Sequence, residues 1–267
     1  MAITTLDGVI AGFQPVKVFY KSATGTLVAG RPVSLWSFGG VPGPGGFDTT
    51  LDGVALSAAV SGQIPFTNPV SGNSYLAKFS GQTTQAGTLL LCDRIWHNGG
   101  FNVSAATSVQ AVSSPTWPTR DANGAANGEQ VIVGLEVQST TGTGTPTLSL
   151  GYTNTSASSG KTGTNINATV ATSPAGSFYP IGLQAGDTGV QSIQSLTLSA
   201  TWTSGAIGLV AYRVLAQVEL GAQIPATLDA LTAGLPRIYD GSVLFLIFIP
   251  NTTTSTLATG SVIVTQG

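Results

Sequence analysis

Reactive side chains are concentrated in one part of the sequence, residues 89–100, which read Leu-Leu-Leu-Cys-Asp-Arg-Ile-Trp-His-Asn-Gly-Gly. This segment holds the one cysteine and the one histidine of the chain, Cys92 and His97. A cysteine nucleophile needs an imidazole within hydrogen-bonding reach. On a strand, side chains five positions apart point to opposite faces, so we expect Cys92 and His97 not to meet.

The same alternation places Asp93, Ile95 and His97 on one face, where a carboxylate and an imidazole find no nucleophile. We expect Leu89, Leu91 and Trp96 in the core, and Asp93, Arg94 and His97 in structural or subunit-interface hydrogen bonds. Cys92 is expected to be a buried strand residue that does not react. The segment predicts no catalytic residue.

Other kinds of site are also disfavoured. One histidine and one cysteine cannot form a zinc site. The acids are scattered, and residues 121–124, Asp-Ala-Asn-Gly, are a fragment of a calcium loop that lacks the later glutamate. Residues 159–162 resemble the end of a phosphate-binding loop, but Thr155 stands where that loop requires glycine. We expect no metal, no cofactor and no small-molecule substrate, and the chain is not expected to be an enzyme.

Charged residues make up 7% of the 267 residues, against roughly 25% in an ordinary soluble domain. Thirty-five glycines and many Ser, Thr and Ala residues take their place. Such a surface suits a protein that is permanently packed into an assembly better than a freely diffusing enzyme. The nine Lys and Arg residues form no cluster, so we expect no binding to nucleic acid.

Compartment signals are few. A single cysteine excludes an intramolecular disulfide, and the first residues carry neither the basic nor the apolar region of a signal peptide. The longest aliphatic run, residues 243–249, stops at Pro250, whereas a membrane helix needs about 20 residues. We expect a protein made in a cytoplasm that does not span a membrane.

Period-two alternation recurs along the chain and is broken by Gly, Pro and Asn turns. It predicts strands at residues 16–20, 75–79, 88–96, 130–137, 147–152, 166–171, 192–202, 209–218, 243–249 and 261–265. One stretch, residues 225–234, indicates a helix because it begins with Pro and ends with Gly. We therefore expect an all-β fold, with a β-sandwich or jelly-roll-like body and one short helix near 225–234.

The first sixty residues differ in composition from the rest. Residues 38–47, Phe-Gly-Gly-Val-Pro-Gly-Pro-Gly-Gly-Phe, cannot hold a regular ladder. We expect residues 1–60 to form an N-terminal arm or small β lobe, needed for attachment more than for folding, and residues 61–267 to form the main β-sandwich domain. The hexapeptide Thr-Thr-Leu-Asp-Gly-Val occurs at residues 4–9 and 49–54, which indicates either a duplicated unit or chance in a Thr- and Gly-rich chain.

Aromatic residues offer two further interpretations. Trp36, Trp117, Trp202, Tyr152 and Tyr179 could be platforms for sugar rings, although such residues are more often core or interface anchors. We expect nine residues to contact a neighbouring subunit: Phe13, Phe19, Trp36, Phe38, Phe47, Arg94, Trp96, His97 and Trp117.

Four short segments of the sequence resemble motifs of structural proteins of tailed bacteriophages. They are residues 90–100, residues 117–121 (Trp-Pro-Thr-Arg-Asp), residues 142–146 followed by 152–154, and residues 235–241 (Leu-Pro-Arg-Ile-Tyr-Asp-Gly). The similar region covers about residues 85–250. These segments consist of turn and core residues, so the resemblance implies no active site.

The resemblance implies a structural component of a virion, assembled in the host cytoplasm. We expect a capsid decoration (cement) protein that clamps neighbouring capsid subunits, with the major capsid protein and copies of itself, such as a trimer, as partners. The alternative is a tail or fibre protein that contacts host surface glycans. An enzyme is the third choice.

Overall fold

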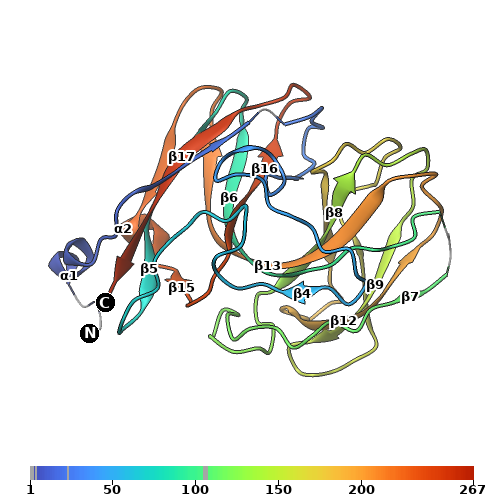
Figure 1. Cartoon of the computed structure of the whole chain (residues 1–267), viewed down its shortest axis with the longest axis horizontal. Helices are drawn as coiled ribbons and strands as arrows, with labels where there is room; N and C mark the ends of the chain where they lie inside the picture. The colour runs from blue at the N-terminus through green and yellow to red at the C-terminus, as the bar shows by residue number, and fades with distance from the viewer. Residues whose placement is uncertain (1–2, 4, 23, 105–107) are drawn as a thin grey trace.

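The computed structural model describes residues 3, 5–22, 24–104 and 108–267, and these residues form an almost entirely β-structure with two short helices. The predicted all-β class is confirmed. The strands make two antiparallel sheets, of six and eleven strands. Together the two sheets build two lobes that lie side by side (Figure 1). No helix among the described residues is long and apolar enough to cross a bilayer.

The six-stranded sheet contains the first and the last strand of the chain. Its order is β14 (Ala226–Asp229), β5 (Ser74–Thr83), β17 (Ala258–Gln266), β1 (Lys17–Lys21) and β3 (Gly40–Val41), and β15 (Arg237–Ile238) also pairs with β5. The C-terminal strand β17 thus lies between two strands from the first third of the chain. Sheet order of this kind requires long-range pairing rather than a chain of hairpins.

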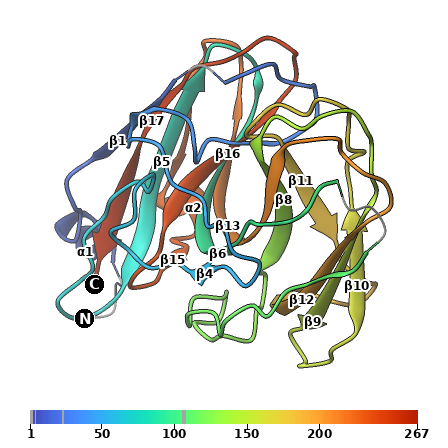
Figure 2. The same cartoon turned by 45° about the vertical axis from the view of Figure 1, so that its right-hand side comes forward.

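The eleven-stranded sheet runs through both lobes. Its order is β2 (Val33–Ser34), β16 (Leu244–Pro250), β6 (Gly87–His97), β13 (Ala206–Leu220), β8 (Ile132–Ser139), β11 (Phe178–Gly182), β10 (Lys161–Asn165), β9 (Leu148–Asn154), β12 (Val190–Leu198) and β7 (Gln110–Ala111), and β4 (Val54–Ala55) pairs with β6. The long strand β13 pairs with β6 toward its C-terminal end and with β8 toward its N-terminal end. It therefore joins the two lobes (Figure 2).

Each lobe has its own apolar core. In the first lobe the six-stranded sheet packs against β16, β6 and the end of β13, and residues such as Leu76, Phe79 and Leu89 meet between the two layers. In the second lobe the larger sheet curls around residues such as Leu135 and Leu150. The two curled, packed sheets agree with the predicted β-sandwich.

Nine of the ten predicted strands overlap an observed strand, although four of these differ from it by three or four residues at one end. Two regions differ more. Residues 166–171 form no strand; the strand is β10, just before them, and Ile166 is 69% exposed. The alternation there faces no core. Strand β11 was not predicted because its sequence, Phe-Tyr-Pro-Ile-Gly, contains a proline and does not alternate.

The predicted helix is only partly correct. Residues 226–229 are strand β14, paired with β5, and the helix α2 (Ala230–Ala233) follows. Asp229 caps it by accepting from the backbone N–H groups of Leu231 and Thr232. A second helix, α1 (Leu6–Ala11), was not predicted; it is capped by Thr5.

The repeated hexapeptide does not mark a repeated structure. Its first copy runs into helix α1, whereas its second copy forms a bend that leads into strand β4. Thr4 lies outside the described residues. The two copies thus adopt different conformations, and the structure provides no sign of duplication at these sites.

The described part of residues 1–60 is built into the sheets. Strand β1 lies between β17 and β3, and Phe19 and Trp36 are almost fully buried. The Gly- and Pro-rich run is held in place too: the Lys21 ammonium donates to the carbonyls of Phe38, Pro42 and Gly43 at 3.2, 3.0 and 3.3 Å. These contacts tie the segment to the same cores as residues 61–267.

We predict that Phe19→Ala lowers the free energy of unfolding by about 3–5 kcal/mol, because it removes a ring buried between the layers. Tyr20→Ala, on the opposite face of the same strand and half exposed, should cost much less. Urea unfolding of both variants measures the difference. A chain lacking residues 1–21 that still unfolded cooperatively, with wild-type stability, would contradict this.

Candidate functional site

Three sequence segments that are far apart along the chain meet around the guanidinium group of Arg120. Its Nη2 donates to the carbonyl oxygens of Leu56 and Arg94 at 2.9 and 3.3 Å, and its Nη1 donates to the carbonyl of Gly241. Its Nε lies 3.5 Å from the carboxylate of Asp93. Residues 90–100, 117–121 and 235–241 are therefore joined at one buried arginine.

Asp93 completes this junction from strand β6. Its side chain is fully buried and accepts from the Ser242 hydroxyl at 2.7 Å and from the Val243 backbone N–H at 2.8 Å. Arg213, on the neighbouring strand β13, donates to the carbonyl of Arg237 at 2.9 Å. The carboxylate thereby fixes the start of strand β16 against the middle of β6.

A second set of buried charges lies further along β6. Arg94 and Glu136 form an ion pair at 2.6 Å, and neither side chain is exposed. The Arg94 guanidinium also donates to Nδ1 of His97 at 3.0–3.2 Å and stacks over the ring of Trp36 at 4.7 Å. We call the six residues of these two sets the polar core: Asp93, Arg94, His97, Arg120, Glu136 and Arg213.

A β-bulge explains why His97 joins Arg94. Trp96 pairs with Ala211 and Arg94 pairs with Tyr212, so Ile95 is an extra residue in strand β6. The expectation that Asp93 and His97 share a face is wrong, because this bulge reverses the alternation after residue 94. His97 lies instead on the side of Arg94.

Cys92 lies on that side as well, in an apolar cluster that includes Trp36. The expectation of opposite faces for Cys92 and His97 therefore fails, again because of the bulge, but no hydrogen bond joins the two among the described residues. Cys92 is fully buried, as predicted. Burial, followed by the charge of Asp93, raises the pKa of its thiol well above the usual value, which keeps the thiol protonated.

His97 is held in its neutral form. Burial first, and then the positive charge of Arg94, lower its pKa to about 3. Because Nδ1 accepts from Arg94, the proton of the neutral ring is on Nε2. A histidine with such a pKa cannot serve as a general base near neutral pH, so this arrangement presents a fixed hydrogen-bond donor.

His97 also lines an open cavity of about 300 Å³. Most of the wall comes from residues 46–61, the segment around strand β4, together with Trp36 and His97. The lining residues are Trp36, Gly46, Phe47, Asp48, Val54, Leu56, Val60, Ser61 and His97. The cavity is therefore partly aromatic, with one carboxylate and one imidazole.

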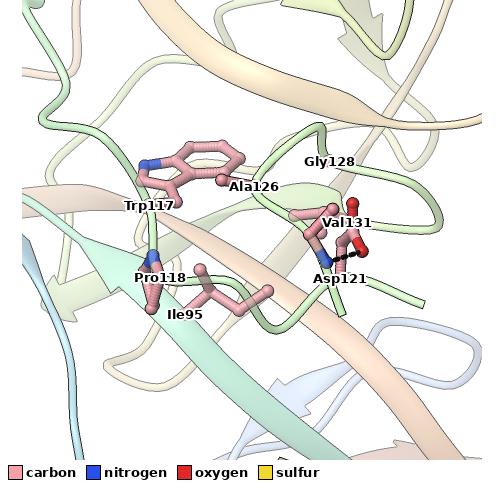
Figure 3. Close-up of a pocket in the computed structure, with 8 residues that line it drawn as sticks. Ile95, Trp117, Pro118, Asp121, Ala126, Gly128 and Val131 are labelled. Carbon is pink, nitrogen blue, oxygen red and sulfur yellow. Dashed lines mark hydrogen bonds between the residues drawn. The ribbon is translucent and has the colours of Figure 1, made fainter. Parts of the chain in front are cut away.

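The calcium-like fragment at Asp121 has a structural explanation. The carboxylate accepts from the backbone N–H groups of Asn123, Ala125 and Glu129 at 2.9, 2.8 and 3.2 Å. Figure 3 shows Asp121 beside Val131, inside the loop that it orders. Among the described residues, no group of three or more His, Cys, Asp or Glu side chains could hold a metal ion.

The nine predicted interface residues fall into two groups. Those with at most 5% exposure are Phe19, Trp36, Arg94, Trp96, His97 and Trp117. Contacts within the chain account for them without a partner. Phe38 and Phe47 are partly buried and Phe13 is 45% exposed, so an interface role stays a prediction for these three. The five proposed sugar platforms are all at most 3% exposed, which leaves no flat ring on the surface for them to present.

Sequence reasoning missed Arg120, Glu136 and Arg213. Glu136 lies between Leu135 and Val137 in a strand of apolar residues, and an isolated charge in such a strand was the available signal. In a chain with so few charges, an ionisable residue inside an apolar run indicates a buried partner.

No family model and no curated protein matches the chain. Among solved structures, the chain is similar to the infectious bursal disease virus VP2 subviral particle, with 9% identity, a TM-score of 0.20, and coverage of 96% of this chain and 80% of that one. A structure of particles derived from the same virus has 9% identity, a TM-score of 0.18, and coverage of 96% and 79%. These TM-scores are too low for the similarity to inform the fold or the function.

We predict that Glu136→Gln lowers the free energy of unfolding by about 3–5 kcal/mol, because it leaves the Arg94 charge buried without its counter-ion. The double variant Arg94→Met/Glu136→Leu should recover much of that loss. Glu219→Gln, on the exposed face of β13, is the control and should change stability by less than about 0.5 kcal/mol. Equal stability of Glu136→Gln and wild type would contradict the structural role of the pair.

We predict that stability falls as the pH drops from 6.5 toward 3, by up to about 1.4 kcal/mol per pH unit. In the unfolded chain His97 has an ordinary pKa of 6.5 and becomes protonated below that pH. In the folded chain its pKa is about 3, so it stays neutral over the same range. The loss should be absent above pH 6.5 and weaker in His97→Gln. Denaturant unfolding between pH 5 and 8 measures it; a flat profile would show that the pKa of His97 is the same in the folded and the unfolded chain.

Proposed function

We propose that the chain is a structural protein of a tailed-phage virion, and specifically a capsid decoration protein bound to the major capsid protein and to copies of itself. The resemblance of the four sequence segments supports this proposal. So does their position, because three of the four converge on Arg120 and thus hold the fold together. Motifs that stabilise the fold rather than form an active site are expected in a structural component of a particle.

The distribution of charge supports the proposal further. Eight of the twenty charged residues are buried: Lys21, Arg31, Asp93, Arg94, Arg120, Asp121, Glu136 and Arg213. Only twelve charges then remain for a surface of 10413 Å². A weakly charged surface of this kind favours association over free diffusion.

The observation that carries the proposal is a set of exposed apolar side chains on the first lobe, which we call the apolar band. Eight exposed side chains from α1, β1, β3, α2 and their flanks form it: Leu6, Ile10, Phe13, Val16, Val18, Tyr20, Val41 and Leu231. Tyr20 pairs with Val41 across β1 and β3, and Leu6, Phe13 and Leu231 line one groove of about 220 Å³. Exposed apolar side chains that lie together, as in these two groups, mark sites of protein–protein contact.

The alternative, a tail or fibre protein that contacts host glycans, is less well supported. It was based on exposed aromatic platforms, and those rings are buried. A catalytic function is disfavoured by the protonated Cys92 thiol and by the neutral His97, whose Nδ1 is occupied by Arg94. We therefore retain the proposal of a non-enzymatic virion protein.

An electron-microscopy map of the virion that carries this chain tests the proposal directly. We expect the chain on the outer surface of the head, with the apolar band against the capsid or a second copy. Density for the chain in the tail would overturn the decoration role, and its absence from purified particles by mass spectrometry would overturn the virion role.

We predict that Val18→Glu/Leu231→Glu abolishes attachment to particles while changing the free energy of unfolding by less than about 1 kcal/mol, because both side chains are exposed. Val109→Glu/Ile166→Glu is the matched control, since these two residues are equally exposed but lie outside the band. Co-sedimentation with heads that lack the protein measures attachment. Normal attachment of the band variant would contradict the proposed surface.

A further inference from the structure

The cavity beside His97 offers a hydrogen-bond donor that the fold holds in place. The Glu136 carboxylate orients Arg94, and Arg94 occupies Nδ1 of His97. The rings of His97 and Trp36 pack nearly perpendicular to each other, with centroids 6.3 Å apart. The His97 ring is therefore fixed in position and in tautomer. Its Nε2–H forms no hydrogen bond among the described residues, and His97 lines the cavity.

The same cavity offers a hydrogen-bond acceptor. Asp48 is partly buried in the lining. Its Oδ1 accepts from the backbone N–H of Thr50 at 2.7 Å and from the hydroxyl of that residue. Its Oδ2 has no hydrogen-bond partner among the described residues, so this oxygen is free to accept from a ligand.

Apolar side chains form most of the rest of the wall, together with Gly46 and Ser61. Phe47 and Val60 are partly exposed and Val54 is exposed, while Leu56 is buried behind them. The Trp36 indole N–H is not available, because it donates to the carbonyl of Gly46 at 2.7 Å. Phe47 thus provides the aromatic surface that a ligand can reach.

We infer that this cavity binds one ring of a neutral sugar. Neighbouring ring hydroxyls supply both the acceptor for His97 Nε2–H and the donor for Asp48 Oδ2, and the C–H face of the ring packs on Phe47. An anionic ligand is disfavoured by Asp48. The charge of Arg94 is compensated by Glu136, and an ammonium or guanidinium group offers no acceptor for His97 Nε2–H, whereas a hydroxyl both donates and accepts. A volume of about 300 Å³ matches the lower end of ordinary small-ligand sites.

This inference does not depend on the proposed function. The cavity is lined by residues 36–61 and His97, whereas the apolar band lies on α1, β1, β3 and α2. A chain attached to a capsid through the band can carry a sugar site elsewhere, and failure of one proposal leaves the other standing.

The single histidine makes a specific experiment possible. In full-length protein labelled with ¹⁵N-histidine, the imidazole spectrum has one set of signals, all from His97. We expect the Nε2–H tautomer at pH 7. Methyl glycosides of glucose, galactose, mannose and N-acetylglucosamine are then titrated up to about 50 mM, which nearly saturates a site with a Kd of about 1 mM. At least one should shift the Nε2–H signal saturably.

Three variants test the geometry. Asp48→Asn should weaken binding of that glycoside at least about tenfold, and Val60→Trp should block it by filling the cavity without removing a polar group. Asp7→Asn, on helix α1, is the control and should bind as wild type does. Wild-type-like His97 tautomer signals in each free variant show that the fold is intact.

Three results would overturn the inference. They are the absence of any shift with the four glycosides, an undiminished shift in Val60→Trp, and a shift produced equally well by acetamide or a short peptide. The last result would identify the cavity as a receptor for a polypeptide segment.

Discussion

The buried ion pair of Arg94 and Glu136 is the interaction on which the rest of the structure depends. The two residues belong to β6 and β8, which are separated by β13, so the pair spans the strand that joins the two lobes. Removing two charges from water costs several kcal/mol per ion. That cost is tolerable only where the surroundings are complementary, and here Trp36 and His97 complete them.

One inserted residue sets this arrangement. Without the bulge at Ile95, His97 would point to the face of Asp93. Arg94 would then lose its hydrogen bonds to His97. With the bulge, strand β6 serves two different purposes. Asp93 holds the loops that carry Arg120 and Ser242 on one side, while Arg94 and His97 hold the N-terminal segment through Trp36 on the other.

Most of the longer strands could be predicted from the sequence because each shows its own alternation or apolar run, and that signal is local. The buried strand β11 shows neither and was missed. The bulge could not be predicted, since it is defined by pairing with β13 and leaves no mark in β6 alone. Nor could the contact between Arg120 and Gly241, which are 121 positions apart. The hexapeptide that forms both a helix start and a bend before β4 shows the same limit: tertiary contacts override local preference.

The placement of charge connects the fold to the surface. The chain has few charges and buries eight of them. The buried charges favour one arrangement of the core, and the surface is left with few charges that oppose association. The N-terminal segment shows both effects. Its inward residues are buried, Phe19 in the core of the first lobe and Trp36 in the apolar cluster around Cys92, whereas its outward residues, Val18 and Tyr20, stay exposed. The same segment therefore completes the fold and carries exposed apolar side chains, so that a substitution that unfolds the segment also disrupts that surface.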